Sequence, residues 1–203
     1  MRPEIVIRYT GFVFLFNSFF LLISALISII LEDSAFVPLI FSAFVAALIG
    51  VFPIIFVPPV ENIHNDEGLM IVVFGWLFSF LIGTLPYIMW GGPFTFTNAW
   101  FESVSGFTTT GSTILTNIEA LPMSLLLWRS FTHWIEGIGI VVFMLAVALP
   151  SGQVAMMLYK NEISSLAVEN FQYRTKKTLR ILLVVYLGLT ILETDRKSTR
   201  LKS

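Results

Sequence analysis

The chain has 203 residues, of which 56% are hydrophobic and only 12% are charged. Because a soluble domain carries about a quarter charged residues, this composition excludes a soluble globular protein and a disordered chain, and it indicates a polytopic membrane protein. A net charge of −1 gives no general attraction to nucleic acid, and the absence of cysteine excludes disulfides, thiolate metal sites and cysteine nucleophiles.

Four apolar stretches are long enough to cross a bilayer as helices, since a hydrocarbon core of about 30 Å needs about 20 helical residues. They cover residues 9–31, 35–57, 69–90 and 125–149. A fifth apolar run, 179–192, is shorter and would reach only about 21 Å as a helix. The sequence therefore predicts four spanning helices and one partial helix.

The distribution of Lys and Arg predicts the orientation of these spans. Arg2 and Arg8 precede the first span, and most other basic residues before the fifth run lie in the stretch 151–178. The stretches 32–34 and 91–124 contain no basic residue. Because cytoplasmic loops carry an excess of Lys and Arg, we expect a cytoplasmic N-terminus and a cytoplasmic loop over 151–178.

The stretch 91–124 lies outside the spans and contains a pattern typical of a re-entrant pore loop. Asn98 is a good candidate N-cap, and a helix over 98–107 would be about 15 Å long, which is half a membrane. The following residues 108–112 read Thr-Thr-Thr-Gly-Ser, and extended carbonyls of such residues can replace the hydration shell of a cation. The alternative is an extracellular Ser/Thr-rich loop with an incidental short helix.

Two longer motifs resemble a known family. Residues 101–115 read Phe-Glu-Ser-Val-Ser-Gly-Phe-Thr-Thr-Thr-Gly-Ser-Thr-Ile-Leu and resemble the first pore-loop signature of the Trk/Ktr potassium uptake proteins. Residues 128–142, which begin Trp-Arg-Ser-Phe-Thr-His-Trp, resemble the start of the helix that follows that loop, and residues 146–150 resemble its end. The resemblance covers most of residues 1–192.

This resemblance implies an all-α polytopic membrane protein from a family with four membrane–pore-loop–membrane repeats around one pore. In this chain it implies two leading transmembrane helices, one complete repeat and the start of a second. The implied segments are 1–58 for the leading helices, 69–150 for the first repeat (helix 69–90, pore helix 98–107, filter 108–112, helix 125–149), 151–178 for a cytoplasmic loop and 179–192 for the partial helix of the second repeat.

The implied function is potassium ion uptake across the cell inner membrane through a pore lined by filter carbonyls, without enzymatic activity and without a bound cofactor. The resemblance places the K⁺-coordinating filter on Thr108, Thr109, Thr110, Gly111 and Ser112. The implied partners are K⁺, the lipid bilayer, a second copy in a homodimer of the full-length protein and a cytoplasmic nucleotide-binding regulatory subunit, with no nucleic acid.

Ionisable residues near this loop are candidates for supporting roles. Glu102 is expected to brace the filter, because a buried carboxylate needs hydrogen-bond partners; the alternative is simple stabilisation near a helix N-terminus. Arg129 shares one helical face with His133 and Glu136, and the resemblance implies that Arg129 ties the pore helix to the next span. Glu136 departs from the family, in which a small residue is common, and an acid there could instead concentrate cations. No His-Glu-x-x-His pattern is present, so no metal site is expected.

Two other functions are weighed against this interpretation. A non-conducting assembly subunit would have no need of residues 108–111, and an intramembrane serine protease would have to use Ser105 with His133 as the base. The tail 193–203 is polar and rich in Lys and Arg, on the side where the spans place the outside. We therefore expect the tail to be foreign sequence and the chain to be an N-terminal fragment; the alternative is a genuine short protein.

Overall fold

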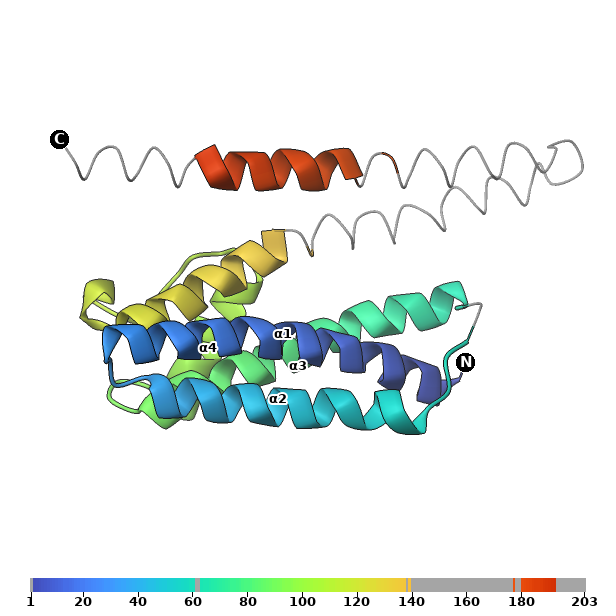
Figure 1. The fold of residues 1–203 in the computed structure, drawn as a ribbon, viewed down its shortest axis with the longest axis horizontal. Coiled ribbons are helices and arrows are strands. Elements are labelled where there is room, and N and C mark those ends of the chain that lie inside the picture. The colour runs from blue at the N-terminus through green and yellow to red at the C-terminus, as the bar shows by residue number, and fades with distance from the viewer. Residues whose placement is uncertain (1, 61–62, 138, 140–176, 178–179, 193–203) are drawn as a thin grey trace, which may run out of the picture. The chain divides into compact units, whose positions relative to one another are not determined.

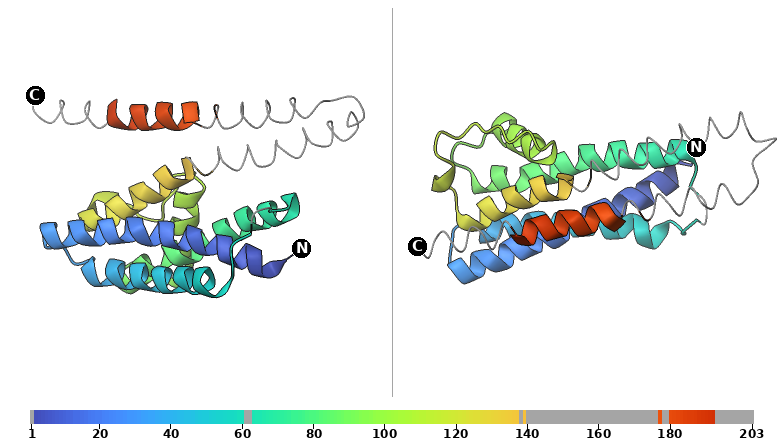
Figure 2. Two further views of the ribbon diagram at one scale, coloured as in Figure 1. Left: turned by 45° about the vertical axis from the view of Figure 1, so that its right-hand side comes forward. Right: turned by 90° about the horizontal axis from the view of Figure 1, so that it is seen from above.

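The computed structural model describes residues 2–60, 63–137, 139, 177 and 180–192. The chain divides into two compact units, Met1–Gly137 and Ile138–Ser203. Three long helices lie side by side in the first unit (Figures 1 and 2). They are α1 (Pro3–Leu31), α2 (Phe36–Phe56) and α3 (Asn65–Trp90). All regular secondary structure in the described part of the chain is helical.

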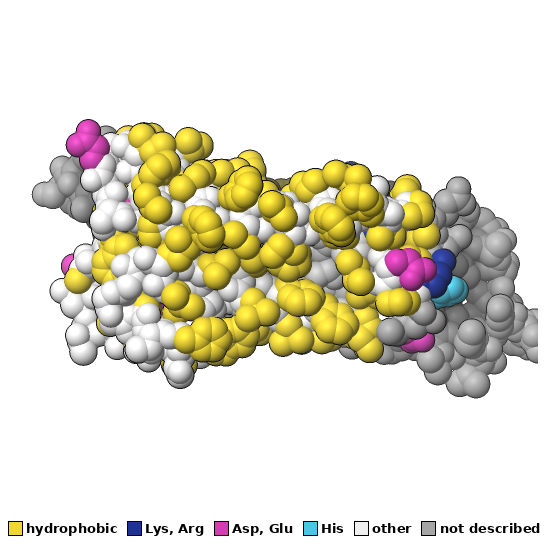
Figure 3. Space-filling view, turned by 90° about the horizontal axis from the view of Figure 1, so that it is seen from below, with side chains coloured by type: hydrophobic (Ala, Val, Ile, Leu, Met, Phe, Trp, Pro, Cys, Tyr) yellow, Lys and Arg dark blue, Asp and Glu magenta, His cyan; other side chains and the backbone are white. Residues whose placement is uncertain are grey.

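The three helices expose apolar side chains and bury polar ones, which is the reverse of the pattern in a soluble protein. Each is long and apolar enough to cross a membrane, and large apolar side chains such as Phe19, Phe44 and Ile55 are exposed, whereas Asn17 and Ser24 are buried. Figure 3 shows a face covered by apolar side chains, with charged side chains and histidine toward its ends. An apolar surface of this extent is suited to lipid rather than water.

Small and polar residues hold the three helices together. A Cβ atom built on Gly11 of α1 would lie 2.7 Å from the carbonyl oxygen of Gly50 in α2, and one on Gly50 would lie 2.8 Å from the oxygen of Gly11. The two backbones therefore touch, as is common between membrane helices. Asn17 of α1 also donates to the Ser79 hydroxyl of α3 at 2.9 Å, so buried polar groups join α1 to α3.

One end of the bundle is closed by basic side chains. Arg2 forms an ion pair with the buried carboxylate of Glu67 at 2.8 Å, at the start of α3. Arg8 donates to the carbonyls of Ile54, in the last turn of α2, and of Val57, its C-cap residue, and neither carbonyl has a helical partner of its own. The N-terminus is thereby fixed to the ends of both neighbouring helices.

The chain after α3 forms a short helix and a loop before it enters another helix. The short elements are α4 (Phe96–Phe107) and the 3₁₀ turn η1 (Ile118–Ala120). A further helix begins at residue 123 and is described to residue 137. Helix α4 packs against α3, and hydrogen bonds described below join this region to the turn between α1 and α2.

The observed helices can be compared with the predicted spans. Helices α1, α2 and α3 contain or nearly coincide with the stretches 9–31, 35–57 and 69–90. The helix predicted over 125–149 starts two residues earlier, and its second half lies outside the described residues. The expected cytoplasmic loop, apart from Lys177, and the expected foreign tail 193–203 also lie outside them. In the second unit, Arg180–Leu192 is a short apolar helix, where 179–192 was expected.

Candidate functional site

Helix α4 is a half-length helix packed closely against α3. Its 12 residues correspond to about 18 Å, which is too short to cross a bilayer. Gly83 of α3 permits the close approach, because a Cβ atom there would lie 2.4 Å from the Ser103 hydroxyl oxygen and 2.6 Å from the ring of Phe107. Ser103 also donates to the Phe80 carbonyl at 2.7 Å, so α4 is fixed to α3 by both packing and hydrogen bonding.

The prediction that Asn98 caps this helix is wrong. The helix begins at Phe96, and Thr95 is the N-cap, whose hydroxyl accepts from the amide of Asn98. The Asn98 side chain instead donates to the Pro93 carbonyl at 2.8 Å. Thr95 is also a good capping residue, and the Gly91–Pro93 turn brings the chain into helical geometry two residues earlier than expected.

The next helix packs against an adjacent face of α4. A Cβ atom built on Gly106 would lie 2.2 Å from the hydroxyl oxygen of Thr132. Thr132 is buried and donates to the Arg129 carbonyl of its own helix at 2.7 Å. Only glycine leaves room for this approach. Helix α4 is therefore held between α3 and the helix over 123–137.

The predicted filter, 108–112, is an exposed, non-helical loop that follows α4 directly. The amide of Thr109 donates to the Gly106 carbonyl at 3.1 Å, and that of Thr110 donates to the Ser105 carbonyl at 3.1 Å. Because the N–H and C=O of a planar trans peptide point in opposite directions, the carbonyls that share these peptide planes point away from α4. These are the carbonyls of Thr108 and Thr109.

Two residues of the loop have backbone dihedral angles that few L-amino acids adopt. Thr109 has φ 54° and Gly111 has φ 73°. Gly111 suits such a conformation because it has no Cβ atom, whereas Thr109 is a β-branched residue at a position that normally excludes one. The loop is then closed by the Ser105 hydroxyl, which donates to the Ser112 carbonyl at 2.6 Å.

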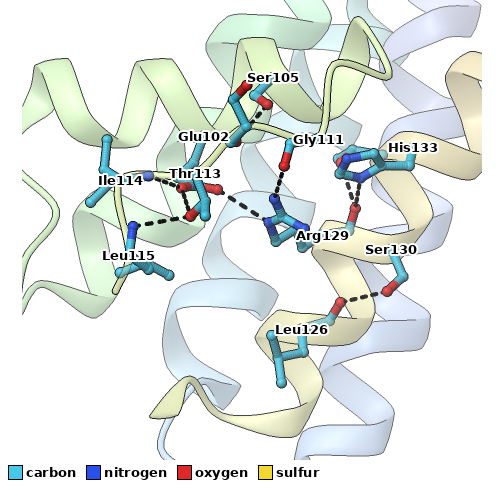
Figure 4. A network of polar contacts seen from close by, with 12 residues as sticks. Glu102, Ser105, Gly111, Thr113, Ile114, Leu115, Leu126, Arg129, Ser130 and His133 are labelled. Atoms are coloured by element: carbon cyan, nitrogen blue, oxygen red, sulfur yellow. Dashed lines mark hydrogen bonds and ion pairs between the residues drawn. The ribbon is translucent and has the colours of Figure 1, made fainter. Parts of the chain in front are cut away.

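A buried carboxylate holds the chain that follows this loop (Figure 4). Glu102 of α4 is 1% exposed. It accepts from the Thr113 hydroxyl and, at 2.8 Å, from the Ile114 amide. Its other oxygen lies 3.1 Å from Nε of Arg129, and a second nitrogen of Arg129 donates to the Gly111 carbonyl at 3.4 Å. One ion pair thus joins α4, the chain after the loop and the next helix.

The carbonyls of the loop differ in what they contact. Thr108 accepts from the Thr109 hydroxyl at 2.8 Å, and Gly111 accepts from Arg129. Two carbonyls, those of Thr109 and Thr110, accept no hydrogen bond from the described residues. The loop therefore presents outward-facing carbonyls.

His133 and Glu136 lie on the same helix as Arg129, but no hydrogen bond in the described chain links their side chains to Glu102 or to loop 108–112. His133 Nδ1 is 2.8 Å from the Arg129 carbonyl oxygen, and Glu136 is 4% exposed. The Ser105 hydroxyl is directed to Ser112. No hydrogen bond links Ser105 to His133 in the described chain, so the pair required by the protease alternative is not assembled. Within the described residues, no group of three His, Cys, Asp or Glu side chains could hold a metal ion.

Glu102 and Arg129 were predicted as supporting residues and lie in the network of contacts beside loop 108–112, whereas Thr113 and the contacts of Asp33 were not predicted. Thr113 lies directly after the loop. Its hydroxyl is a hydrogen-bond donor that could have been paired with the carboxylate of Glu102 in the preceding helix. Asp33 accepts from the amide of Ser124, 91 residues away, and nothing in the local sequence indicates this contact.

These observations define an all-α polytopic membrane protein in which a half-length helix and a braced loop lie between two longer helices. The chain belongs to the family described as "TrkH: Cation transport protein", whose sequence profile matches residues 58–194. The predicted fold class and the resemblance to Trk/Ktr proteins are confirmed.

Individual relatives agree with this assignment. The chain is 32% identical over 196 residues to the Trk system potassium uptake protein TrkH of Vibrio parahaemolyticus, an alignment that covers 94% of this chain and 40% of the relative. It is 29% identical to an uncharacterised cation transporter of Methanocaldococcus jannaschii, covering 93% of this chain and 40% of that protein. The crystal structure of the potassium transporter TrkH from V. parahaemolyticus matches with a TM-score of 0.74 at 30% identity, covering 95% of this chain and 38% of that chain.

Proposed function

We propose that the protein to which this chain contributes takes up K⁺ across the cell membrane, and that residues 108–112 form one segment of its selectivity filter. The observation that carries the proposal is the direction of the loop peptides. The loop amides are bonded back to the end of α4 at Ser105 and Gly106, which turns the carbonyls of Thr108 and Thr109 outward. Such carbonyls can replace the hydration shell of a cation.

The electrostatics of α4 favour a cation at the same place. The C-terminus of a helix carries a partial negative charge, and α4 ends at Phe107, directly before the loop. Lipid would leave these peptide groups unsatisfied, and irregular backbone at membrane depth is tolerated only where protein or water contacts it. The exposed side of the loop is therefore the side we assign to the ion pathway.

In this proposal, Glu102 and Arg129 support the filter rather than bind the ion. Glu102 fixes the chain after the loop at Ile114, and Arg129 fixes the Gly111 carbonyl. Arg129 also neutralises the buried carboxylate, so the brace adds no net charge beside the pathway. Carbonyl ligands must keep fixed positions to distinguish cations by size, and this brace fixes Gly111 and the chain that follows the loop.

Further features of the complete protein belong to the same proposal. The family resemblance implies four such repeats in one chain, a homodimer and a cytoplasmic nucleotide-binding regulatory subunit. Arg2 and Arg8 lie at the end of the bundle opposite the 32–35 turn, which favours a cytoplasmic N-terminus. The loop 108–112 would then approach the pathway from outside.

The experiment replaces Gly111 with serine in a chimera of residues 1–192 and the remaining part of the V. parahaemolyticus relative. Gly111 has φ 73° and no atom within 4 Å of an added Cβ, so the change strains the backbone without a clash. We expect roughly a tenfold loss of K⁺ preference over Na⁺ in uptake by a K⁺-uptake-deficient host, which corresponds to a change of about 1.4 kcal/mol in the difference between the binding free energies of the two ions.

Gly91→Ser is the matched control. Gly91 has φ 82° and also has no atom within 4 Å of an added Cβ, but it lies at the end of α3, outside the loop. The control should leave ion preference unchanged. Equal selectivity of the Gly111→Ser chimera and the unsubstituted chimera would remove the filter assignment.

A further inference from the structure

The turn between the first two helices contacts both helices that flank loop 108–112. Asp33 bonds to Ser124 in the first turn of the helix over 123–137. The next residue, Ser34, accepts a hydrogen bond from the indole nitrogen of Trp90 at 3.1 Å, and Trp90 is the last residue of α3. Two adjacent residues of this turn therefore contact the end of α3 and the start of the helix over 123–137. Helix α4 and the loop lie between these two points in the chain.

The helix over 123–137 has no capping side chain of its own. The Pro122 carbonyl accepts from Leu125 and Leu126 at 3.0 Å, which places Pro122 at the N-cap, and proline has no side-chain acceptor. The first amides of a helix need partners from elsewhere. The carboxylate of Asp33 supplies one, because its Oδ2 accepts from the Ser124 amide at 3.0 Å and its Oδ1 from the Ser124 hydroxyl at 2.8 Å.

The Asp33 carboxylate is itself held in place before it reaches Ser124. It accepts from the Ala35 amide at 3.1 Å and from the Ser28 hydroxyl. Glu32, directly before it, closes α1 in the left-handed conformation with φ 52°. The turn thus holds the Asp33 carboxylate in one orientation through its hydrogen bonds to Ala35 and Ser28.

The contact continues from Ser124 to the loop. Arg129 lies five residues further along the same helix and bonds to both Glu102 and the Gly111 carbonyl. A displacement of the start of this helix would carry Arg129 with it, since a helix transmits motion along its axis as a stiff rod. The position of the Gly111 carbonyl is therefore linked to the leading helix pair through two side chains.

We propose that the 32–35 turn is a strap that sets the separation of the two helices flanking loop 108–112, with Asp33 as a positioning residue that acts through Ser124 and Arg129. Its effect on ion selectivity rests on the proposed function, whereas its effect on the loop does not. The simpler alternative is that Asp33 only stabilises the first turn of one helix. The strap and the simple cap differ in one expectation: a local cap at the start of the helix can replace Asp33 fully only if Asp33 is a simple cap.

The test measures amide hydrogen exchange by mass spectrometry on the 203-residue chain in lipid nanodiscs. In Asp33→Ala, we expect amides of residues 109–114 and of the first turn after Pro122 to exchange roughly tenfold faster, which corresponds to the loss of one charge-assisted hydrogen bond. In Asp33→Ala with Pro122→Asp, a local cap should restore the first turn but leave residues 109–114 fast. Glu32→Gln, in the same turn, should change neither.

Two outcomes would overturn the strap. The first is unchanged exchange over 109–114 in Asp33→Ala; the second is full recovery of these residues with the local cap, which would show that Asp33 is only a cap. If Asp33→Ala does not yield folded protein, Asp33→Asn gives a milder form of the comparison, because its single side-chain oxygen cannot accept from both the Ala35 and the Ser124 amides.

A transport measurement then separates the strap from the filter. In the chimera described above, Asp33→Ala with Pro122→Asp should lower K⁺ preference over Na⁺ several-fold, whereas Pro122→Asp alone should not. A loop that loosens in exchange while selectivity stays the same would support the strap and count against the filter. A loop that does not loosen would contradict the strap whatever the ion preference.

Discussion

Glu102 fixes the chain directly after loop 108–112. Its side chain is buried, and it accepts from a hydroxyl and a backbone amide while it pairs with Arg129 at 3.1 Å. A buried ion pair adds little net stability compared with apolar packing, but removal of one partner leaves an uncompensated charge. Single and double substitutions of Glu102 and Arg129 should therefore differ in their effect on stability.

Glu102→Gln should destabilise the protein by about 3 kcal/mol, because it leaves the Arg129 guanidinium without its counter-charge. The measurement is the heat-induced unfolding midpoint in detergent or nanodiscs. Glu119→Gln, an exposed acid in the same segment, is the control and should have no effect. Addition of Arg129→Gln to Glu102→Gln should recover part of the loss; a strictly additive double variant would show that the two residues do not act as a pair.

The pH dependence of the Asp33 contact has a definite sign. Burial alone would raise the pKa of the Asp33 carboxyl, but hydrogen bonds from Ser28, Ser124 and Ala35 outweigh burial and hold the pKa below its ordinary value of 3.8. The folded state therefore favours the ionised form, whose contribution is complete above the ordinary pKa and is lost as the pH falls through the lowered pKa.

We accordingly expect the difference in unfolding midpoint between the unsubstituted chain and Asp33→Asn to be constant from about pH 8 to pH 5 and to shrink only below about pH 4. Heat-unfolding midpoints measured across this range test the expectation. A difference that vanishes already near pH 6 would mean that another group titrates, and that the Asp33 contacts are weaker than their distances indicate.

At the scale of elements, glycines decide how closely α4 is held. Gly83 admits α4 to α3, and Gly106 admits the helix over 123–137 to α4. At both contacts, side chains of one helix thus pack directly against the glycine of the other, as is typical where small residues lie between membrane helices. The rigidity of the loop follows from this packing as much as from its hydrogen bonds.

Gly106→Ala should destabilise the protein by about 1–3 kcal/mol, because the added Cβ would lie 2.2 Å from the Thr132 hydroxyl oxygen. Thr132→Ala, which removes that oxygen, should restore part of the lost stability in the double variant. Gly68→Ala is the control, since an added Cβ there meets nothing within 4 Å and alanine favours a helix. Equal midpoints for Gly106→Ala and Gly68→Ala would show that the contact is looser than described.

The sequence was informative about elements and about residues whose partners are near in the chain. Apolar runs located α1, α2 and α3 to within a few residues at most ends, because about 20 apolar residues are needed to cross the bilayer. The cost of burying a lone carboxylate also predicts that Glu102 has hydrogen-bond partners, and the structure shows three of them. The start of α4 was misplaced because Thr95 and Asn98 are both good caps, and only the preceding turn chooses between them.

Contacts between distant residues could not be read from the sequence. Pro122 shows that the helix after it lacks a local cap, but it does not reveal that Asp33 fills this role. In the same way, Gly11 and Gly50 are ordinary helix residues until the two helices cross at that point. Such contacts depend on how whole helices are arranged, which local propensity does not determine.

At the scale of the whole molecule, the described helices place polar contacts at both ends and in the interior and leave apolar side chains toward lipid (Figure 3). Loop 108–112 differs because it is exposed and polar, and it lies beside a helix too short to span. The chain matches about 40% of the length of the V. parahaemolyticus relative. In our proposal, other segments of the complete protein surround the exposed side of the loop.

The most direct test of the central claim is anomalous diffraction from crystals of the chimera grown with Rb⁺ or Tl⁺ in place of K⁺. The proposal predicts anomalous peaks beside loop 108–112, with backbone carbonyls of Thr108 to Thr110 at coordinating distance and with Glu102 and Arg129 outside the coordination shell. A well-ordered loop without any peak, or an ion bound instead by the Glu102 carboxylate, would contradict it.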